Sequence, residues 1–477
     1  MRPLIVLAIL AASTSGVAAQ GAPLSSADSA LVGRILLAED RRDTADAALA
    51  AGLRHPDPRV RLLAWRARER IADPRFARRD SLPALRPPPS WPEPAWRLRY
   101  RALGAQRTNC DTLRTALADS AWPVRLHAAD LAPAECGADE QLVSTFRRWV
   151  DALPADASRR RRGEVAWHAA AHGLVALARV RPAEARGRVQ RLAAHRQWQV
   201  RAYIARAAAL IADTARLRTL ARDPDDNVKE AAIGGLSKLT GHVDDDLYLA
   251  ALGARGAQAV RAAAIALKGS PRADVSEAAS ATFERWVARA NASERDARVA
   301  LLEAAGRPAS DDRPPPPASE LPPRAVALAL GAEVRLRVVM APSSGGGGSF
   351  VVRLRGDGAP MMAARVLELA RRGYYDGTSW HRVEPDFVIQ GGGPGASEYV
   401  GYARYFRDEL GTVPHVRGTV GMSTRGHDTG DAQWFVNLRD NLRLGRDYTV
   451  FAEVVDGIDV VDGILEGDTI ARIEEVR

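Results

Sequence analysis

A short pattern that recurs along the first two thirds of the chain constrains the fold most. A turn rich in Pro, Asp or Trp is followed by Val, then by Arg or Lys, and then by a segment rich in Ala and Leu. Counting weaker copies near Leu98, Val165 and Val299, the pattern recurs every 26 to 41 residues, roughly the interval at which repeats predict a stacked helical array. The clearest copies carry this valine at Val60, Val124, Val200, Val228 and Val260.

Each valine of the pattern opens an amphipathic helix. The residues Val200, Tyr203, Ile204 and Ala207 have i, i+3, i+4, i+7 spacing and fall on one helical face. The preceding Asp or Pro suits the cap or first turn of a helix. One such helix cannot bury its apolar face alone, so neighbouring helices must stack. The region 20–306 therefore resembles the HEAT-like repeat family, which implies an all-α solenoid whose concave surface binds client or partner proteins.

The N-terminus has the features of an export signal. Met1-Arg2 precedes an apolar run from Pro3 to Ala12, and Val17-Ala18-Ala19 ends in small residues. The run is too short to cross a bilayer, which needs about 20 residues. We therefore expect a secretory signal peptide over 1–19 that is cleaved before Gln20, and an exported protein that is periplasmic or secreted, with no membrane segment after cleavage. The cleavage site adjoins no Cys, so a lipid anchor is not predicted.

The chain has two cysteines, Cys110 and Cys136. In an exported chain the oxidising compartment makes a disulfide between them the default expectation. The alternative, a reactive thiol or a metal pair, lacks the paired-His motif or second Cys pair that such a site needs.

Composition changes at about residue 307. The segment 307–324 contains Arg313-Pro-Pro-Pro-Pro317 and Pro322-Pro323, which favours an extended linker. Before residue 325 the chain has 50 basic and 37 acidic residues, whereas 325–477 has 17 basic and 21 acidic residues. Acidic residues are interspersed among the N-terminal arginines, so a solvated helical surface is expected there and nucleic-acid binding is not.

Two segments of the C-terminal part are dense in aromatic and polar residues. They run from Tyr374 to Gly392 and from Gly418 to Val436. Both segments, with Asp376-Gly377 and the closing stretch Tyr448 to Val454, resemble the cyclophilin family of peptidyl-prolyl isomerases over 325–477. The resemblance implies a mainly β domain, an eight-stranded antiparallel barrel with two capping helices, and a substrate groove on its outer face. The expected fold class is thus a multidomain chain, an all-α solenoid followed by this barrel.

The resemblance also assigns roles to individual residues, and it implies neither a cofactor nor a metal. Arg382, Phe387 and Gln390 match the catalytic positions. The chain differs from the best-known members at Arg443, where they have tryptophan, and at Tyr448, where histidine is frequent. The positions that match the substrate-binding groove are Val388, Met422, Ser423, Thr424, Gln433, Phe435, Leu444 and Tyr448.

These residue types suit prolyl isomerisation. Rotation about an X-Pro bond must break amide conjugation, against a barrier of about 18–20 kcal/mol, and it needs no covalent intermediate. A guanidinium that hydrogen-bonds near the prolyl nitrogen favours the deconjugated state, while apolar walls hold the ring. The sequence thus predicts an exported isomerase that acts on proline-containing polypeptides and assists folding. The alternative is a non-catalytic scaffold or chaperone-like binding protein that uses the solenoid and a proline-binding barrel.

Other motifs carry weaker hypotheses. Gly391 to Ala396 formally fits a dinucleotide-binding pattern, but Pro394 and the residues after it give no helix for a pyrophosphate. His427, Asp428 and Asp431 could suggest a metal cluster, yet their Gly-rich surroundings favour turn residues. The sequence contains no G-x-S-x-G elbow and no P-loop lysine, so hydrolase and NTPase functions lack support.

Overall fold

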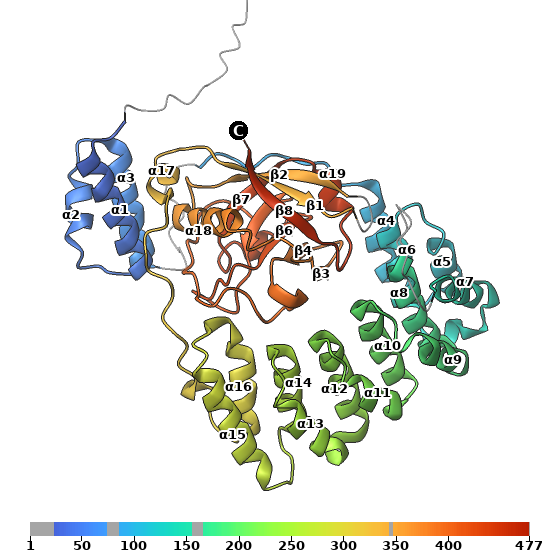
Figure 1. The fold of residues 1–477 in the computed structure, drawn as a ribbon. Coiled ribbons are helices and arrows are strands. Elements are labelled where there is room, and N and C mark those ends of the chain that lie inside the picture. Colours follow the sequence, from blue (N-terminus) through green and yellow to red (C-terminus); the bar gives the residue numbers. More distant parts are fainter. Residues whose placement is uncertain (1–22, 74–84, 155–165, 343–346, 477) are drawn as a thin grey trace, which may run out of the picture.

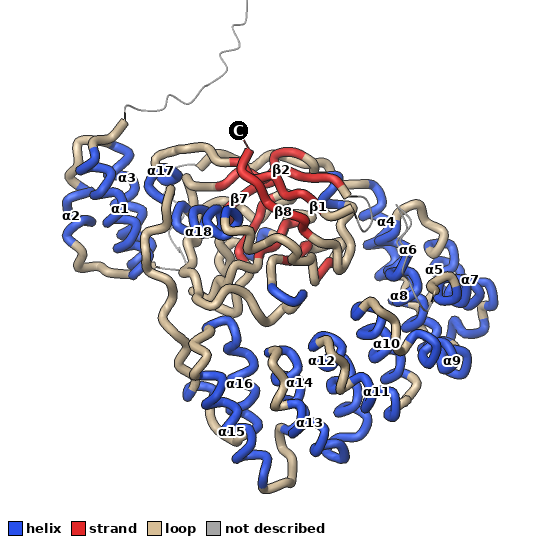
Figure 2. Tube along the Cα trace, in the orientation of Figure 1, coloured by secondary structure: helices blue, strands red, loops and turns tan. Residues whose placement is uncertain are grey.

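The structure, a computed structural model, describes residues 23–73, 85–154, 166–342 and 347–476. The predicted signal peptide, residues 1–19, lies outside these ranges. In the described part, no helix is both long enough and apolar enough to cross a membrane. Figure 2 shows the strands gathered in the middle of the molecule, with helices on several sides of them.

Three helices form a separate N-terminal unit, α1 (Ser26–Arg41), α2 (Ala47–Leu53) and α3 (Pro58–Ala72). The hydroxyl of Ser25 caps α1, and Asp57 caps α3 ahead of Pro58 at its first turn. Their apolar side chains, such as Val32 and Ile35, belong to the same core as the C-terminal barrel. The structure therefore differs from the expectation of one solenoid over 20–306, because these helices pack beside the barrel, apart from the other repeats (Figure 1).

The remaining N-terminal helices form the solenoid. They are α4 (Ala95–Ala105), α5 (Cys110–Ala116), α6 (Trp122–Leu131), α7 (Glu140–Asp151), α8 (Ala166–Val180), α9 (Pro182–Leu192), α10 (Trp198–Leu210), α11 (Thr214–Leu220), α12 (Asp226–Thr240), α13 (Asp245–Ala251), α14 (Ala257–Leu267), α15 (Asp274–Val287) and α16 (Arg295–Ala304). The even-numbered helices from α4 to α16 each pack on the next, which makes one continuous row. This row carries the repeat valines Val124, Val200, Val228 and Val260, which are all buried in its core, whereas Val60 lies in α3.

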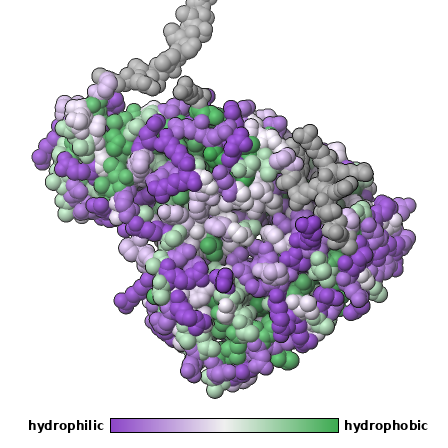
Figure 3. Space-filling model, viewed as in Figure 1, coloured by the Kyte–Doolittle hydropathy of each residue, from purple (hydrophilic) through white to green (hydrophobic). Residues whose placement is uncertain are grey.

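The solenoid curves around the barrel. Figure 1 shows α4 to α16 sweeping along one side of the barrel and beneath it, while α1–α3 lie on the opposite side. In the same view, Figure 3 shows hydrophobic residues mixed with hydrophilic ones over the lower part of the solenoid. The exposed large apolar side chains of α12, η3 (Gly241–Asp244) and α14 are Leu239, Val243 and Ile265.

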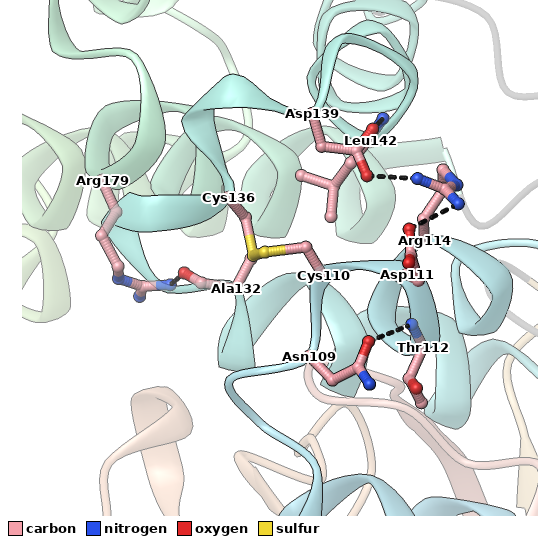
Figure 4. Close-up of a disulfide and its surroundings, with 10 residues drawn as sticks. All are labelled: Asn109, Cys110, Asp111, Thr112, Arg114, Ala132, Cys136, Asp139, Leu142 and Arg179. Carbon is pink, nitrogen blue, oxygen red and sulfur yellow. Dashed lines mark hydrogen bonds and ion pairs between the residues drawn. A yellow bond between two sulfur atoms is a disulfide. The ribbon is translucent and has the colours of Figure 1, made fainter.

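A disulfide joins two parts of the solenoid. Cys110, at the start of α5, is bonded to Cys136 in the short helix η2 (Ala134–Ala138), as Figure 4 shows. Asp139 caps α7 just after η2, and Arg114 of α5 forms an ion pair with it. The cross-link and this ion pair both hold α5 against the start of α7.

The C-terminal domain is an eight-stranded antiparallel sheet in the order β3-β4-β6-β5-β7-β2-β1-β8. Its strands are β1 (Arg335–Met340), β2 (Gly348–Leu354), β3 (Arg382–Val383), β4 (Val388–Gly391), β5 (Thr419–Met422), β6 (Trp434–Asn437), β7 (Val450–Asp456) and β8 (Ile470–Val476). The sheet curls so that the segment before β3 meets the start of β8. Backbone hydrogen bonds of 2.8 Å run from Gly377 to Ile470 and from Trp380 to Asp468. They close the sheet into a barrel, as the sequence predicts.

Three helices accompany the barrel, α17 (Ala325–Ala329), α18 (Pro360–Arg371) and α19 (Ile458–Asp462). Helix α18 is buried along most of its length, and Arg365 of α18 forms a buried ion pair with Asp40 of α1. The barrel core contains large side chains that are fully buried, among them Trp380, Phe350 and Phe451.

The proline-rich segment 307–324 lies against the rest of the molecule. Its Asp312 pairs with buried Arg298 of α16, at 2.7 Å. The Ala318 N–H donates to the carbonyl of Tyr405 in the barrel, and Glu320 pairs with Arg404 at 2.7 Å. The linker is therefore fastened to both domains that it joins.

Candidate functional site

A groove of about 250 Å³ lies on the outer face of the barrel, next to the solenoid. One wall is apolar and the other is polar. The residues that line it are Asp296, Arg382, Phe387, Val388, Gln390, Glu398, Tyr399, Ser423, Thr424, Arg425, Phe435, Leu444 and Tyr448.

The apolar wall is a small cluster that is distinct from the barrel core. Val388 of β4, Phe435 of β6 and Leu444 of the short helix η7 (Leu442–Leu444) are buried together, with Phe387 and Tyr448 packed against them. The Phe435 and Tyr448 rings meet edge to face, with centroids 5.6 Å apart. Rings held in this way form a shallow apolar slot.

The polar wall begins with Arg382 on β3 and Gln390 on β4, which pair across the sheet. Arg382 Nη1 donates to Gln390 Oε1 at 3.5 Å, and Gln390 Nε2 donates to Ser423 Oγ at 3.1 Å. Gln390 Nε2 also donates to Gln433 Oε1 at 3.2 Å. These bonds orient the amide and the guanidinium along one side of the slot.

Arg382 keeps access to solvent. Its side chain is 38% exposed, its Nε lies 3.8 Å from Glu384, and its guanidinium carbon lies 5.9 Å from the centre of the Phe387 ring. The other nearby carboxylate, Asp386, pairs with Arg101 and Arg439. The Arg382 cation therefore has one long ion pair, with Glu384, and lines the groove.

Two histidines near the groove are held neutral. Burial, together with the positive charges of Arg382 and Arg425, lowers the pKa of His381 to about 4. Burial likewise lowers the pKa of His415 to about 4. His415 Nε2 donates to the carbonyl of Tyr448 at 3.0 Å, and its ring stacks on Phe435. His415 therefore supports the apolar wall from behind.

Most of the residues that the sequence predicted for the groove do line it. Two do not. The Met422 side chain is fully buried in the barrel core, because β5 turns that side chain inward. Gln433 is also buried, and it acts from behind the polar wall by donating through Nε2 to the carbonyl of Val400 at 2.9 Å.

Four residues that line the groove were not predicted from the sequence: Asp296, Glu398, Tyr399 and Arg425. Arg425 lies in a segment that the resemblance covers, where the density of polar residues was a usable signal. Asp296 belongs to solenoid helix α16, more than eighty residues before the nearest strand residue of the groove, Arg382. Its place follows only from how the two domains dock.

The lining residues include no Cys and no His. Within the described ranges, no group of three or more His, Cys, Asp or Glu side chains is placed to hold a metal ion. The arrangement offers an apolar slot beside an oriented cation. Such a site binds an apolar ring and stabilises charge or a lone pair next to it.

Comparison with known proteins agrees with this geometry. The family described as "Cyclophilin type peptidyl-prolyl cis-trans isomerase/CLD" matches residues 338–476. Human "Peptidyl-prolyl cis-trans isomerase-like 1" is 38% identical over 140 residues, which cover 27% of this chain and 83% of the human protein. "Peptidyl-prolyl cis-trans isomerase B" of Escherichia coli K12 is 38% identical over 128 residues, which cover 24% of this chain and 78% of the bacterial protein.

These matches are confined to the C-terminal quarter or so of the chain, the part that forms the barrel and its groove. The match to a family of isomerases and the slot with Arg382 beside it lead to the same assignment. Through its C-terminal domain, the chain belongs to the cyclophilin-type peptidyl-prolyl cis-trans isomerase family.

Proposed function

We propose that the protein is an exported isomerase of proline-containing polypeptides, in which the solenoid, of the HEAT-like type, binds clients or a partner. The observation that carries the catalytic part is the position of Arg382. Its guanidinium is oriented by Gln390 and lies beside the apolar slot of Phe387, Phe435 and Leu444. A proline ring in the slot brings its imide nitrogen toward this cation.

Prolyl isomerisation requires few groups besides this cation and the apolar slot. The Arg382 guanidinium hydrogen-bonds to the prolyl nitrogen as that nitrogen loses conjugation, and the bond is stronger in the twisted state than in either planar isomer. Ser423 and Thr424 supply hydroxyls and backbone groups along the slot for the rest of the peptide. Uncatalysed isomerisation takes tens to hundreds of seconds, so an exported catalyst removes a slow folding step.

The kinetic test uses the full chain from Gln20. The cis-to-trans rate of a panel of X-Pro peptides is measured for the wild type, for Arg382→Ala and for Arg337→Ala, an exposed arginine of β1 that pairs with Glu474 outside the groove. We expect acceleration that Arg382→Ala abolishes and Arg337→Ala preserves. A wild-type rate equal to background would reject catalysis and favour a protein that only binds proline-containing segments.

A second cavity supports client binding by the solenoid. It measures about 260 Å³ and lies between the barrel and helices α10 and α12. Trp198, Tyr203 and Glu230 line it from the solenoid. Glu398 and Tyr399 line both this cavity and the groove, so the two are adjacent. A polypeptide longer than the groove continues into this space.

Substrate length tests this part of the proposal. Trp198→Ala should raise KM for an unfolded proline-containing protein and leave KM for a tetrapeptide unchanged. Val243→Ser, at a side chain 79% exposed and outside the cavity, is the control. Equal KM values for wild type and Trp198→Ala on the long substrate would contradict client binding at this surface.

Export is supported by the sequence of residues 1–19 and by the disulfide between Cys110 and Cys136, a bond typical of oxidising compartments. N-terminal sequencing of the protein from a fractionated source cell, with thiol labelling, tests it. We expect a mature N-terminus at Gln20 and no free thiol. An uncleaved chain in the cytosol would contradict export.

A further inference from the structure

Solenoid helix α16 reaches the wall of the groove. Asp296, in the first turn of α16, lines the groove, and its Oδ2 lies 2.8 Å from Nε of Arg425 in the barrel. The two side chains are 27% and 20% exposed, so the pair is largely shielded from solvent. The ion pair joins the two domains directly at the site.

Arg425 has two further partners on the barrel. Its Nη1 donates to Oδ2 of Asp431 at 2.8 Å, and its Nη2 donates to the carbonyl of Glu398. Asp431 is 2% exposed, so this part of the interaction is buried. With the Asp296 carboxylate 2.8 Å from Nε, each nitrogen of the Arg425 guanidinium lies beside an acceptor, which restricts the orientation of its plane.

The carbonyl of Glu398 connects the Arg425 guanidinium to the catalytic side chains. It accepts a second hydrogen bond, from Gln433 Nε2 at 3.2 Å. Gln433 Oε1 in turn accepts from Gln390 Nε2, and Gln390 Oε1 accepts from Arg382. An unbroken series of polar contacts therefore runs from Asp296 of the solenoid to Arg382 of the groove.

The solenoid is also firmly seated on this side of the barrel. Asn227 of α12 donates to the carbonyl of Gly395 at 2.9 Å. The guanidinium carbon of Arg261, in α14, lies 4.0 Å from the centre of the Tyr399 ring. Just before α16, the Ala292 N–H donates to the carbonyl of Ala403 at 2.8 Å. Contacts from successive repeats thus fix the barrel segment that carries Glu398, which leaves Asp296 in a defined position.

We propose that Asp296 is a positioning residue of the isomerase, through which solenoid helix α16 fixes Arg425 and, by way of Gln433 and Gln390, the orientation of Arg382. The proposal rests on the proposed catalytic function. It makes the docked solenoid part of the catalytic apparatus, besides any role in client binding.

Loss of Asp296 should affect turnover more than binding, because the slot that holds the proline ring stays intact. We expect Asp296→Ala to lower kcat for an X-Pro tetrapeptide by a factor on the order of five to ten, with KM changed by less than about twofold. Asp296→Glu, which retains the charge, should recover part of the loss. The matched control is Glu303→Gln on the same helix, which breaks an exposed pair with Lys268 and should leave kcat unchanged.

Two further measurements complete the test. The double-mutant cycle of Asp296→Ala with Arg425→Gln should show strong non-additivity in kcat, since both changes break the same series of contacts. Selectively labelled glutamine should show that Asp296→Ala shifts the side-chain amide signals of Gln390 and Gln433 in an NMR spectrum, whereas Glu303→Gln does not. Thermal unfolding of each variant verifies that the chain is folded.

Unchanged glutamine signals and unchanged kcat in a folded Asp296→Ala protein would overturn the proposal, as would a loss confined to KM. The NMR readout needs no turnover. If the wild type proved inactive on every peptide, the proposed function would fail, while the glutamine signals would still decide whether Asp296 positions the polar wall.

Discussion

Gly421 and Phe435 are paired across strands β5 and β6, and the Phe435 ring lies directly over the glycine. A Cβ at position 421 would lie 2.8 Å from Cε2 and 2.9 Å from Cε1 of that ring. The slot therefore needs glycine at this position, because any side chain would push the Phe435 ring out of the apolar wall.

We predict that Gly421→Ala raises KM for proline peptides on the order of tenfold, since moving a packed ring typically costs about 1–3 kcal/mol. Peptide titration and steady-state kinetics measure it. Gly187→Ala is the matched control, because Gly187 in helix α9 has nothing within 4 Å of an added Cβ. An unchanged KM in Gly421→Ala would show that Phe435 does not hold the substrate ring.

The pH dependence of catalysis should be weak. His381 adjoins Arg382, but its pKa is lowered to about 4 by burial and by the neighbouring positive charges. It therefore stays neutral from about pH 5 upward, and no lining residue of the groove is a histidine. We predict that kcat/KM is constant between about pH 5.5 and pH 8. A sigmoidal change centred near pH 6.5 would contradict this prediction.

Stability should depend on pH through Glu230. Burial raises the pKa of this carboxyl to about 7, although Arg261 Nη1 lies 3.5 Å from Glu230 Oε1. A carboxyl whose pKa is higher in the folded than in the unfolded state stabilises the fold at low pH. That stability is lost as the pH rises from about 4.5 to 7. We predict that Glu230→Gln unfolds at a higher temperature than the wild type at pH 8, and at a similar temperature at pH 4.5. The opposite order would indicate that the Arg261 pair outweighs burial.

Reduction of the Cys110–Cys136 disulfide should loosen one end of the solenoid and spare the barrel. The cysteines are 26 residues apart, which corresponds to about 3.5 kcal/mol of loop-closure entropy in the unfolded chain. We predict faster amide hydrogen exchange in α5 to α7 of Cys110→Ser/Cys136→Ser, with β4 to β6 unchanged. Uniformly faster exchange in both regions would contradict a local effect.

Arg97 of α4 should be the most important single contact between the N-terminal end of the solenoid and the barrel. It is fully buried, and it donates to the carbonyls of Pro385 and Leu438 and to Asp462. Breaking a buried ion pair costs about 3–5 kcal/mol, so Arg97→Met should lower the denaturant midpoint strongly. Arg99→Met on the same helix, where the arginine is 46% exposed and pairs with Asp119, should change stability by less than about 1 kcal/mol. Equal effects would contradict the role given to Arg97.

The sequence predicted what local patterns encode. Apolar spacing such as Val200, Tyr203 and Ile204 identified the stacked helices, and these side chains are buried in the solenoid core. Two dense segments identified the cyclophilin-type barrel, and Arg382, Gln390 and Phe435 lie together in its groove. In each case the information is carried by residues close in sequence, so their periodicity or motif suffices.

The contacts between domains could not be predicted in this way. The sequence predicts that helices α1–α3 are further repeats, because their amphipathic faces resemble those of the solenoid helices. In the structure, their apolar side chains belong to the barrel core and not to the solenoid core. Asp296 has no motif around it, and its function depends on a partner at position 425. Met422 shows the converse limit, because one residue at the end of a strand can turn to the core while its neighbours Ser423 and Thr424 face the groove.

The solenoid is attached to the barrel near both of its ends, by Arg97 of α4 and by Asp296 of α16. A free solenoid can gain or lose a repeat without penalty to the others, because each repeat contacts only its neighbours. Here the barrel holds the row of helices at α4 and α16 and also at α12 and α14. Inserting or deleting a repeat between α4 and α16 would move these contact points, so the length of the row has to match the barrel.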